Sequence, residues 1–167
     1  MGNPQIFSSL SLELKIIEAK NVESKTRGDL FVRCYLPSGG SNRRRIGVDT
    51  KKVPSKNDHV WNQSFSLECS GIGHGGSMDL TKLSQESLVF ELRWRKRVPV
   101  LGTSGFGGSK LLRRAEIAWE EVIESPNMVL DKWVYLVNST GGDRAAKLKG
   151  HYTNKDFEMH ASKTIGY

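Results

Sequence analysis

Apolar and polar residues alternate along most of this chain, and this period of two constrains the fold more than any other feature of the sequence. From residue 10 to residue 16, leucine or isoleucine occupies every even position and a polar residue occupies every odd one. A strand that is buried on one face and hydrated on the other has this pattern. We therefore predict a strand at 10–19.

Further strands are expected from the same pattern or from runs of β-forming residues. Breakers such as Pro37-Ser38-Gly39-Gly40 separate these runs, and one helical turn is expected around Trp119-Glu120-Glu121-Val122. A last strand is expected within 145–160, although Asn154-Lys155-Asp156 is typical of a turn. The other predicted strands are 29–36, 44–53, 61–69, 88–94, 110–117 and 132–137. Roughly eight short strands with little helix predict an all-β antiparallel sandwich or barrel.

Length and charge narrow the class of protein. The 167 residues suffice for one domain whose core needs no disulfide or metal. Lysine and arginine total 25 against 18 acidic residues, which gives a formal net charge of +7. This excess favours anionic partners such as phosphoinositide membranes, nucleic acid or acidic proteins.

No targeting segment is visible in the sequence. The N-terminal residues lack the basic flank and apolar run of a signal peptide, and no run of about 18 apolar residues occurs. Gly2 does not fit N-myristoylation because Ile6 stands where Ser or Thr is needed, and no C-terminal Cys is present for prenylation. Cys34 and Cys69 lack the clustering of zinc ligands and are expected to be small core or strand residues. We expect a cytoplasmic protein.

Several motifs gain meaning from their order and spacing. Ala19-Lys20-Asn21-Val22 ends the first predicted strand, and Gly28-Asp29-Leu30-Phe31-Val32-Arg33-Cys34 begins the second. Thr50-Lys51 is followed by Trp61-Asn62-Gln63-Ser64-Phe65, and Leu88-Val89-Phe90-Glu91-Leu92 forms a later strand. These segments resemble A-x-N-L, S-D-P-Y-V-K-V, T-K, P-V-W-N-E-T-F and L-x-F-x-V of the C2 domain, the second conserved region of protein kinase C.

The resemblance implies an eight-stranded antiparallel Greek-key β-sandwich with three loops at one end. Because few residues precede the first strand, the eighth strand is expected from the C-terminus, which is the type II topology of the family. The predicted domain is 10–160, with tails at 1–9 and 161–167. A single C2 domain with short tails is similar in architecture to small plant C2 proteins associated with stress and defence signalling, which favours regulation over catalysis.

Many C2 domains bind Ca²⁺ through acidic residues of the first and third loops, and the ion takes about 6–8 oxygen ligands. Glu23 and Asp29 match the two acidic positions of the first loop. The third loop should continue as Asp-x-Asp, but this chain has Arg93-Trp94-Arg95 and no acidic residue before Arg114. Two guanidinium groups there would repel the ion and could instead pair with Glu23 and Asp29. We expect no metal site, and we expect Asp29 to be a turn residue.

A first basic segment runs from Arg93 to Arg114 and interleaves cations with apolar residues and glycines. Cations attract anionic headgroups while apolar side chains insert below them, so this composition suits a membrane interface. Trp94 is expected in the core with Leu92, whereas membrane insertion and a flexible loop both remain open for Leu101 and Phe106. The predicted lipid-binding residues are Arg93, Arg95, Lys96, Arg97, Leu101, Phe106 and Lys110.

A second basic stretch surrounds the third predicted strand. Lys51 matches a C2 strand position whose lysines contribute to a polybasic groove for phosphatidylinositol bisphosphate, and Arg45 lies on the same face. The alternative is ordinary solvated charge. The predicted lipid-binding residues of this stretch are Arg43, Arg44, Arg45, Lys51 and Lys52.

No motif supports catalysis. Gly71-Ile72-Gly73-His74-Gly75-Gly76 has the letters of a dinucleotide-binding loop, but the strand before it alternates instead of being continuously apolar. In 102–110, Gly108 stands where a phosphate-binding loop needs lysine, and the histidines show no zinc-binding spacing. We expect no catalytic residue, no enzyme activity and no cofactor.

Three functions follow from these observations. The first is a calcium-independent C2 module that docks peripherally on anionic phospholipids, either phosphoinositides or phosphatidylserine, at the cytosolic face of the plasma membrane. The second is a protein-interaction adaptor in stress or defence signalling. The third, a nucleic-acid binder, ranks last because the chain lacks the aromatic motif of an RNA-binding surface.

Overall fold

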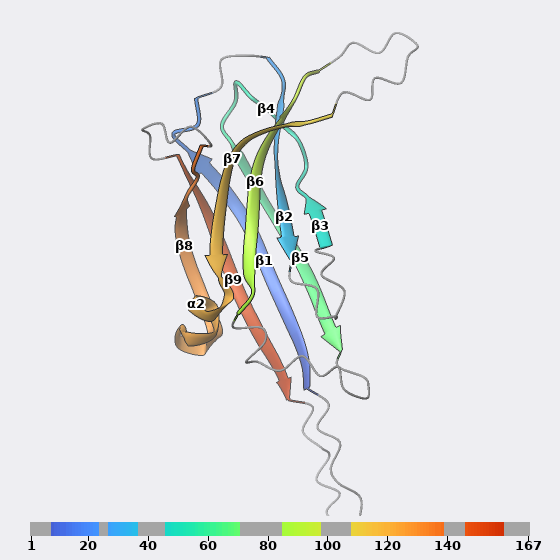
Figure 1. The fold of residues 1–167 in the computed structure, drawn as a ribbon, viewed down its shortest axis with the longest axis vertical. Helices are drawn as coiled ribbons and strands as arrows, with labels where there is room; N and C mark the ends of the chain where they lie inside the picture. Colours follow the sequence, from blue (N-terminus) through green and yellow to red (C-terminus); the bar gives the residue numbers. More distant parts are fainter. Residues whose placement is uncertain are drawn as a thin grey trace, which may run out of the picture.

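The computed structural model describes residues 8–23, 27–36, 46–70, 85–97, 108–138 and 146–158, which form two antiparallel sheets (Figure 1). Sheet A has the strand order β5-β1-β9-β8, and sheet B has the order β3-β2-β6-β7 with β4 also paired to β2. The elements are β1 (Ser8–Lys20), β2 (Asp29–Leu36), β3 (Ile46–Asp49), β4 (Val53–Pro54), β5 (Val60–Ser70), β6 (Ser87–Arg95), β7 (Lys110–Ala118), α2 (Trp119–Glu124), a 3-10 turn (Pro126–Met128), β8 (Val129–Tyr135) and β9 (Lys147–Glu158). The all-β sandwich predicted from the alternation is confirmed.

The predicted strand at 44–53 is divided in two by Thr50. The Thr50 hydroxyl accepts a hydrogen bond from the Val32 N–H (2.9 Å), and the Thr50 N–H donates to the Val32 carbonyl (2.9 Å). Because the hydroxyl replaces a backbone acceptor at this position, β2 stays paired while the neighbouring strand is interrupted. Two short strands, β3 and β4, therefore stand where one was predicted.

The last strand, β9, lies between β1 and β8 in sheet A. This placement confirms that the C-terminal region supplies the strand beside β1, as the type II topology requires. The turn suggested by Asn154-Lys155-Asp156 is wrong, because these residues pair with Leu12, Ser11 and Leu10 of β1 in continuous register. Pairing along the full length of β1 thus overrides a local turn preference.

The core lies between the inner faces of the two sheets. Phe90 of β6 and Tyr152 of β9 meet across it, with ring centroids 5.9 Å apart. Trp61 closes the core from β5, and Trp119 and Val122 of α2 cover it between β7 and β8 (Figure 1). Cys34 is fully buried here as a free thiol, as expected for a small core residue, whereas the side chain of Cys69 lies outside the described residues.

Candidate functional site

Hydrogen bonds connect the segments at one end of the sandwich. The Ser55 N–H donates to the Gly28 carbonyl (2.8 Å), and the Gly28 N–H donates to the Ser55 hydroxyl (3.2 Å). The Ala19 N–H donates to the His59 carbonyl (2.9 Å), which joins the end of β1 to the start of β5. Here β1, β6 and β8 finish and β2, β7 and β9 begin, and we call this the loop end.

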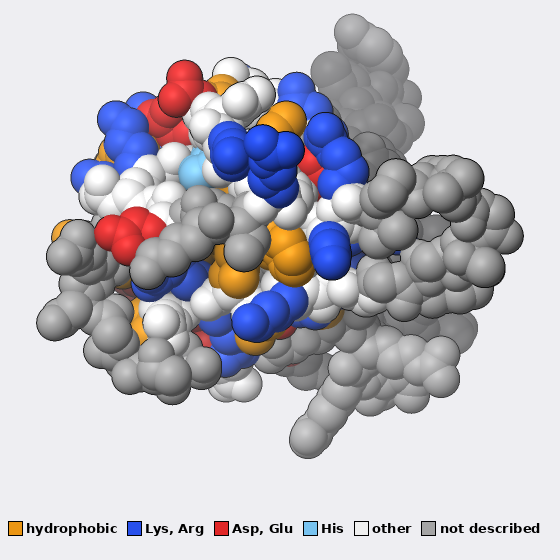
Figure 2. All heavy atoms as spheres, turned by 90° about the horizontal axis from the view of Figure 1, so that it is seen from above, with side chains coloured by type: hydrophobic (Ala, Val, Ile, Leu, Met, Phe, Trp, Pro, Cys, Tyr) orange, Lys and Arg blue, Asp and Glu red, His pale blue; other side chains and the backbone are white. Residues whose placement is uncertain are grey.

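Lysine and arginine side chains dominate the loop end. Figure 2 looks onto it and shows blue side chains spread across the surface, with hydrophobic side chains exposed between them and fewer acidic ones. The described cations of this end are Lys20, Arg27, Lys56, Arg95, Lys96, Arg97, Lys110 and Lys147, and the described acidic residues are Glu18, Glu23, Asp29 and Asp58. The excess charge of the chain is therefore concentrated where the sequence predicted binding loops.

Only part of the predicted lipid-binding set can be placed. Lys96, Arg97 and Lys110 are exposed at the loop end, and Arg95 is half-buried beside them. Lys51 and Lys52 are exposed in the segment that joins β3 to β4. The predicted residues outside the described parts of the chain are Arg43, Arg44, Arg45, Leu101 and Phe106.

Arg93 is engaged within the protein. Its guanidinium donates to the Ser109 hydroxyl (2.6 Å), to the Ser109 carbonyl (3.0 Å) and to the Glu91 carboxylate (3.0 Å), and its side chain is only 17% exposed. These bonds tie the end of β6 to the start of β7. Of the cations predicted to bind lipid, Arg93 is thus the one whose charge is already satisfied.

The acidic position at the start of β2 is neutralised by an arginine. The Arg97 guanidinium donates to the Asp29 carboxylate across 2.9 Å. The sequence led us to expect Arg93 or Arg95 as the partner of Asp29, and that choice is corrected here because Arg93 turns toward Ser109 and Glu91. Within the described residues, no group of three or more His, Cys, Asp or Glu side chains is arranged to hold a metal ion.

The outer face of sheet B carries paired charges. Arg33 donates two hydrogen bonds to Asp49 (2.8 and 3.1 Å), and this contact raises the pKa of Arg33 above its ordinary value. The Tyr35 hydroxyl donates to Glu91 (2.8 Å). Asp49 therefore neutralises Arg33, and Lys51 remains an exposed cation whose backbone N–H is held by the Gln63 amide oxygen (2.7 Å).

Trp94 packs against the core, as the alternation after Leu92 predicted. Its indole lies directly over Gly28: a Cβ built on Gly28 would be 2.2 Å from Trp94 Nε1 and 2.7 Å from the Arg95 carbonyl oxygen. Only glycine allows this approach. The close contact holds the segment before β2 against the end of β6, where Asp29 and Arg97 meet.

Sequence reasoning missed a cluster on the outer face of sheet A. The Nζ atoms of Lys147, Lys20 and Lys149 lie 4.7, 5.4 and 5.7 Å from the centroid of the Trp133 ring. Trp133 alternates with the buried Val134, and Lys149 follows the buried Leu148, so the sequence did carry a signal that these residues face outward. It carried no signal of the strand register that brings them together.

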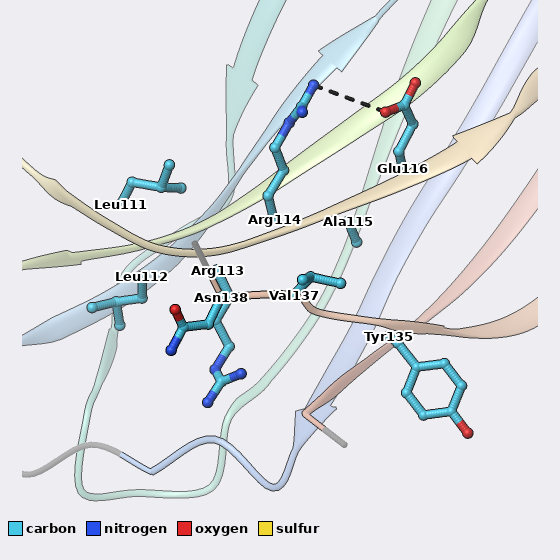
Figure 3. A pocket seen from close by; sticks show the side chains of 9 residues that line it. All are labelled: Leu111, Leu112, Arg113, Arg114, Ala115, Glu116, Tyr135, Val137 and Asn138. Carbon is cyan, nitrogen blue, oxygen red and sulfur yellow. Dashed lines mark ion pairs between the residues drawn. The ribbon is translucent and has the colours of Figure 1, made fainter. Parts of the chain in front are cut away.

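A cavity of about 510 Å³ lies at the seam between β7 and the segment that follows β8 (Figure 3). A bridge between Arg114 and Val137 joins the two sides, with backbone hydrogen bonds of 2.9 and 2.7 Å. Leu111, Tyr135 and Val137 line the cavity and are 43, 66 and 61% exposed, so most large exposed hydrophobic residues among the described ones gather here. Figure 3 shows Arg113 and Arg114 on opposite sides of the β7 backbone.

Comparison with known proteins identifies the fold. No protein-family profile and no curated protein sequence matches the chain. A structure of the first, A-lettered C2 domain of plant extended synaptotagmin 1 is similar over 88% of this chain and 95% of its own, with a TM-score of 0.61 and 16% identity. A CC2D1B structure is similar over 86% of this chain and 54% of its own (TM-score 0.62, 14% identity).

An extended synaptotagmin 2 structure with an SMP domain and two C2 domains gives a TM-score of 0.59 at 16% identity, over 89% of this chain and 28% of its own. This chain thus spans about half of the CC2D1B chain and just over a quarter of the synaptotagmin 2 chain. The fold predicted from the motifs is confirmed as that of a C2 domain. None of the helices described here has the length and apolar character needed to cross a bilayer.

Proposed function

We propose that this chain, which has the C2 fold, is a calcium-independent module that docks peripherally on anionic phospholipid membranes through its loop end. The observation that carries the proposal is the Arg97–Asp29 ion pair of 2.9 Å, since a guanidinium occupies the partner position that a calcium ion would need. The ligands are phosphatidylserine or phosphoinositide headgroups. The module has no catalytic role and acts as a signalling or membrane-targeting regulator at the cytosolic face of the plasma membrane.

The magnitude of the attraction supports this mode of binding. Arg95, Lys96, Arg97 and Lys110 lie within one short stretch of the loop end. Each cation near an anionic leaflet contributes about 1 kcal/mol, so these residues together supply roughly 4 kcal/mol, about a thousandfold in affinity. No metal is needed to reverse the sign of the surface, because it is already positive.

Vesicle flotation tests the proposal. We expect the chain to float with vesicles of phosphatidylcholine plus phosphatidylserine or phosphatidylinositol bisphosphate, and not with phosphatidylcholine alone. Chelation of Ca²⁺ should leave this binding unchanged. The double variant Arg95→Glu plus Arg97→Glu should weaken it at least a hundredfold, because two attractive charges become repulsive. The variant is measured in chelator so that its new carboxylates recruit no cation.

Lys15→Glu plus Arg114→Glu is the matched control. It makes the same change in net charge at exposed positions away from the loop end and should bind within a few-fold of the original chain. Release of the original chain by chelator would contradict calcium independence. Equal losses in the two double variants would show that net charge, and not the loop end, governs binding.

The seam cavity favours a second candidate, a protein-interaction module. Exposed apolar side chains gathered at one site are typical of protein contacts. Val137→Asp places a charge among them and should abolish specific cross-linking to a protein partner while vesicle flotation is retained. Cross-linking that is unchanged by Val137→Asp would eliminate the cavity as the contact.

A further inference from the structure

Trp133 and the three lysines around it form a site outside the loop end proper. In the sheet register Trp133 faces Lys149, Tyr135 faces Lys147, and Lys147 in turn faces Lys20 on β1. All five side chains therefore project from the outer face of sheet A. We call them the Trp133 patch.

The patch does little for the stability of the fold. An exposed cation–π contact contributes about 0.5–1 kcal/mol, and ammonium groups gathered around one ring repel one another. The carboxylate beside them is Glu18, which lies 4.0 Å from Lys20 and faces Lys149 in the register. Three ammonium groups against one carboxylate leave a local positive excess that an anion would neutralise.

The nearest other acidic residue on this face is already engaged. Asp131, two residues before Trp133, accepts a hydrogen bond from His151 Nδ1 at 2.5 Å. Glu13 lies further along β1, facing Thr153. Within the described part of sheet A, the end that carries Trp133 is thus positive and the other end is balanced.

The aromatic residues of the patch point to a lipid surface as its partner. Tyr135 is 66% exposed and Trp133 is half-buried, and both have a polar tip on an apolar ring. Tyrosine and tryptophan with these properties are enriched at the interface between headgroups and acyl chains, where lysine contacts phosphate. A purely electrostatic partner would have no use for Tyr135.

The position of the patch matches a bilayer that contacts the loop end. Lys20 is the last residue of β1 and Lys147 is the first of β9, so both lie at the loop end itself. Trp133 and Lys149 lie two residues further down their strands, about 7 Å. A membrane resting on Arg95, Lys96 and Arg97 reaches the patch if the sandwich tilts toward sheet A.

We propose that the Trp133 patch is a second lipid-contact site, and that the domain binds an anionic bilayer with its loop end and the adjoining outer face of sheet A together. This inference rests on the proposed membrane function and adds the orientation of the bound domain. Phosphate-bearing headgroups contact Lys20, Lys147 and Lys149, and the rings of Trp133 and Tyr135 lie at the headgroup boundary.

The intrinsic fluorescence of Trp133 reports on this contact. The chain has four tryptophans, of which Trp61 and Trp119 are 1% exposed and Trp94 packs against the core. With vesicles of phosphatidylcholine and phosphatidylserine, we expect a blue shift of emission and quenching by brominated acyl chains. Both effects should vanish in Trp133→Phe and persist in Trp94→Phe, the matched control at the loop end.

A charge variant tests the lysines separately. Lys147→Glu plus Lys149→Glu should weaken vesicle binding at least tenfold, whereas Lys15→Glu, on the same face near the other end, should not. Thermal unfolding of each variant confirms that it is folded before its binding is compared.

The outcomes separate the two proposals. Flotation with anionic vesicles but without a Trp133 response overturns the patch and leaves the loop-end proposal intact. Absence of flotation overturns the membrane function and the patch with it. A Trp133 response to an oligonucleotide or an acidic peptide, with no response to vesicles, overturns the lipid assignment and identifies another anion.

Discussion

Gly28 shows how one residue fixes the geometry of the loop end. The Trp94 ring and the Arg95 carbonyl both occupy the space where a side chain would begin. The Asp29–Arg97 ion pair forms directly beside this contact. The position therefore couples the packing of Trp94 to the arrangement of charges that the proposed function uses.

Gly28→Ala should destabilise the protein by about 1–3 kcal/mol, since a methyl group 2.7 Å from a backbone carbonyl cannot be accommodated by a side-chain rotation alone. Urea unfolding measures the change. Gly108→Ala is the control, because a Cβ at that position meets nothing within 4 Å. Equal stability of the two variants would show that Trp94 does not hold this contact in solution.

At the scale of elements, Thr50 decides where β3 ends and β4 begins. Its side chain is 5% exposed, and its hydroxyl accepts the Val32 N–H and lies 3.1 Å from the Lys51 carbonyl. A buried N–H without a partner costs about 1–3 kcal/mol. The break between the two strands is therefore a stabilised feature, and it directs Lys51 and Lys52 toward solvent.

Thr50→Val keeps the shape of the side chain and removes the acceptor, so we expect a loss of about 1–3 kcal/mol in the free energy of unfolding. Thr50→Ser retains the hydroxyl and should lose less. Hydrogen exchange at the Val32 amide should accelerate in Thr50→Val only. Identical exchange in both variants would mean that the backbone of the break supplies another acceptor.

At the scale of the molecule, the two sheets meet over a core that includes ionisable groups. Cys34 of sheet B and Tyr152 of sheet A are both fully buried. Burial raises the pKa of the Cys34 thiol and of the Tyr152 phenol above their ordinary values of 9.0 and 10.0. The folded state thus holds both groups neutral at pH values at which the unfolded chain ionises them.

Stability should consequently fall in alkaline solution. A folded-state pKa above the unfolded value gives a contribution that is complete below the unfolded pKa and is lost as the pH rises beyond it, by about 1.4 kcal/mol per pH unit and group. We expect the thermal midpoint to decline above pH 9.0. Tyr152→Phe should flatten the decline above pH 10.0. A decline of equal slope in this variant would assign the effect to other groups.

The elements and the candidate site were predictable to different degrees. The strands at 10–19 and 29–36 followed from alternation and β propensity, because both depend on neighbouring residues. The pairing of Asn154, Lys155 and Asp156 with β1 did not follow, because it joins residues far apart in the chain. For the same reason the partner of Asp29 was assigned to the wrong arginine, since two residues along the chain after β6 decide which guanidinium reaches it.

By itself the sequence determined the class of fold, the topology that places a C-terminal strand beside β1, and the replacement of third-loop acidic residues by arginine. These features are written in local patterns and in the order of motifs. Only the tertiary structure decided that Arg97 pairs with Asp29, that Arg93 is engaged by Ser109 and Glu91, and that Lys20, Lys147 and Lys149 surround Trp133. Strand register brings such residues together, and register is set by the pairing of whole strands.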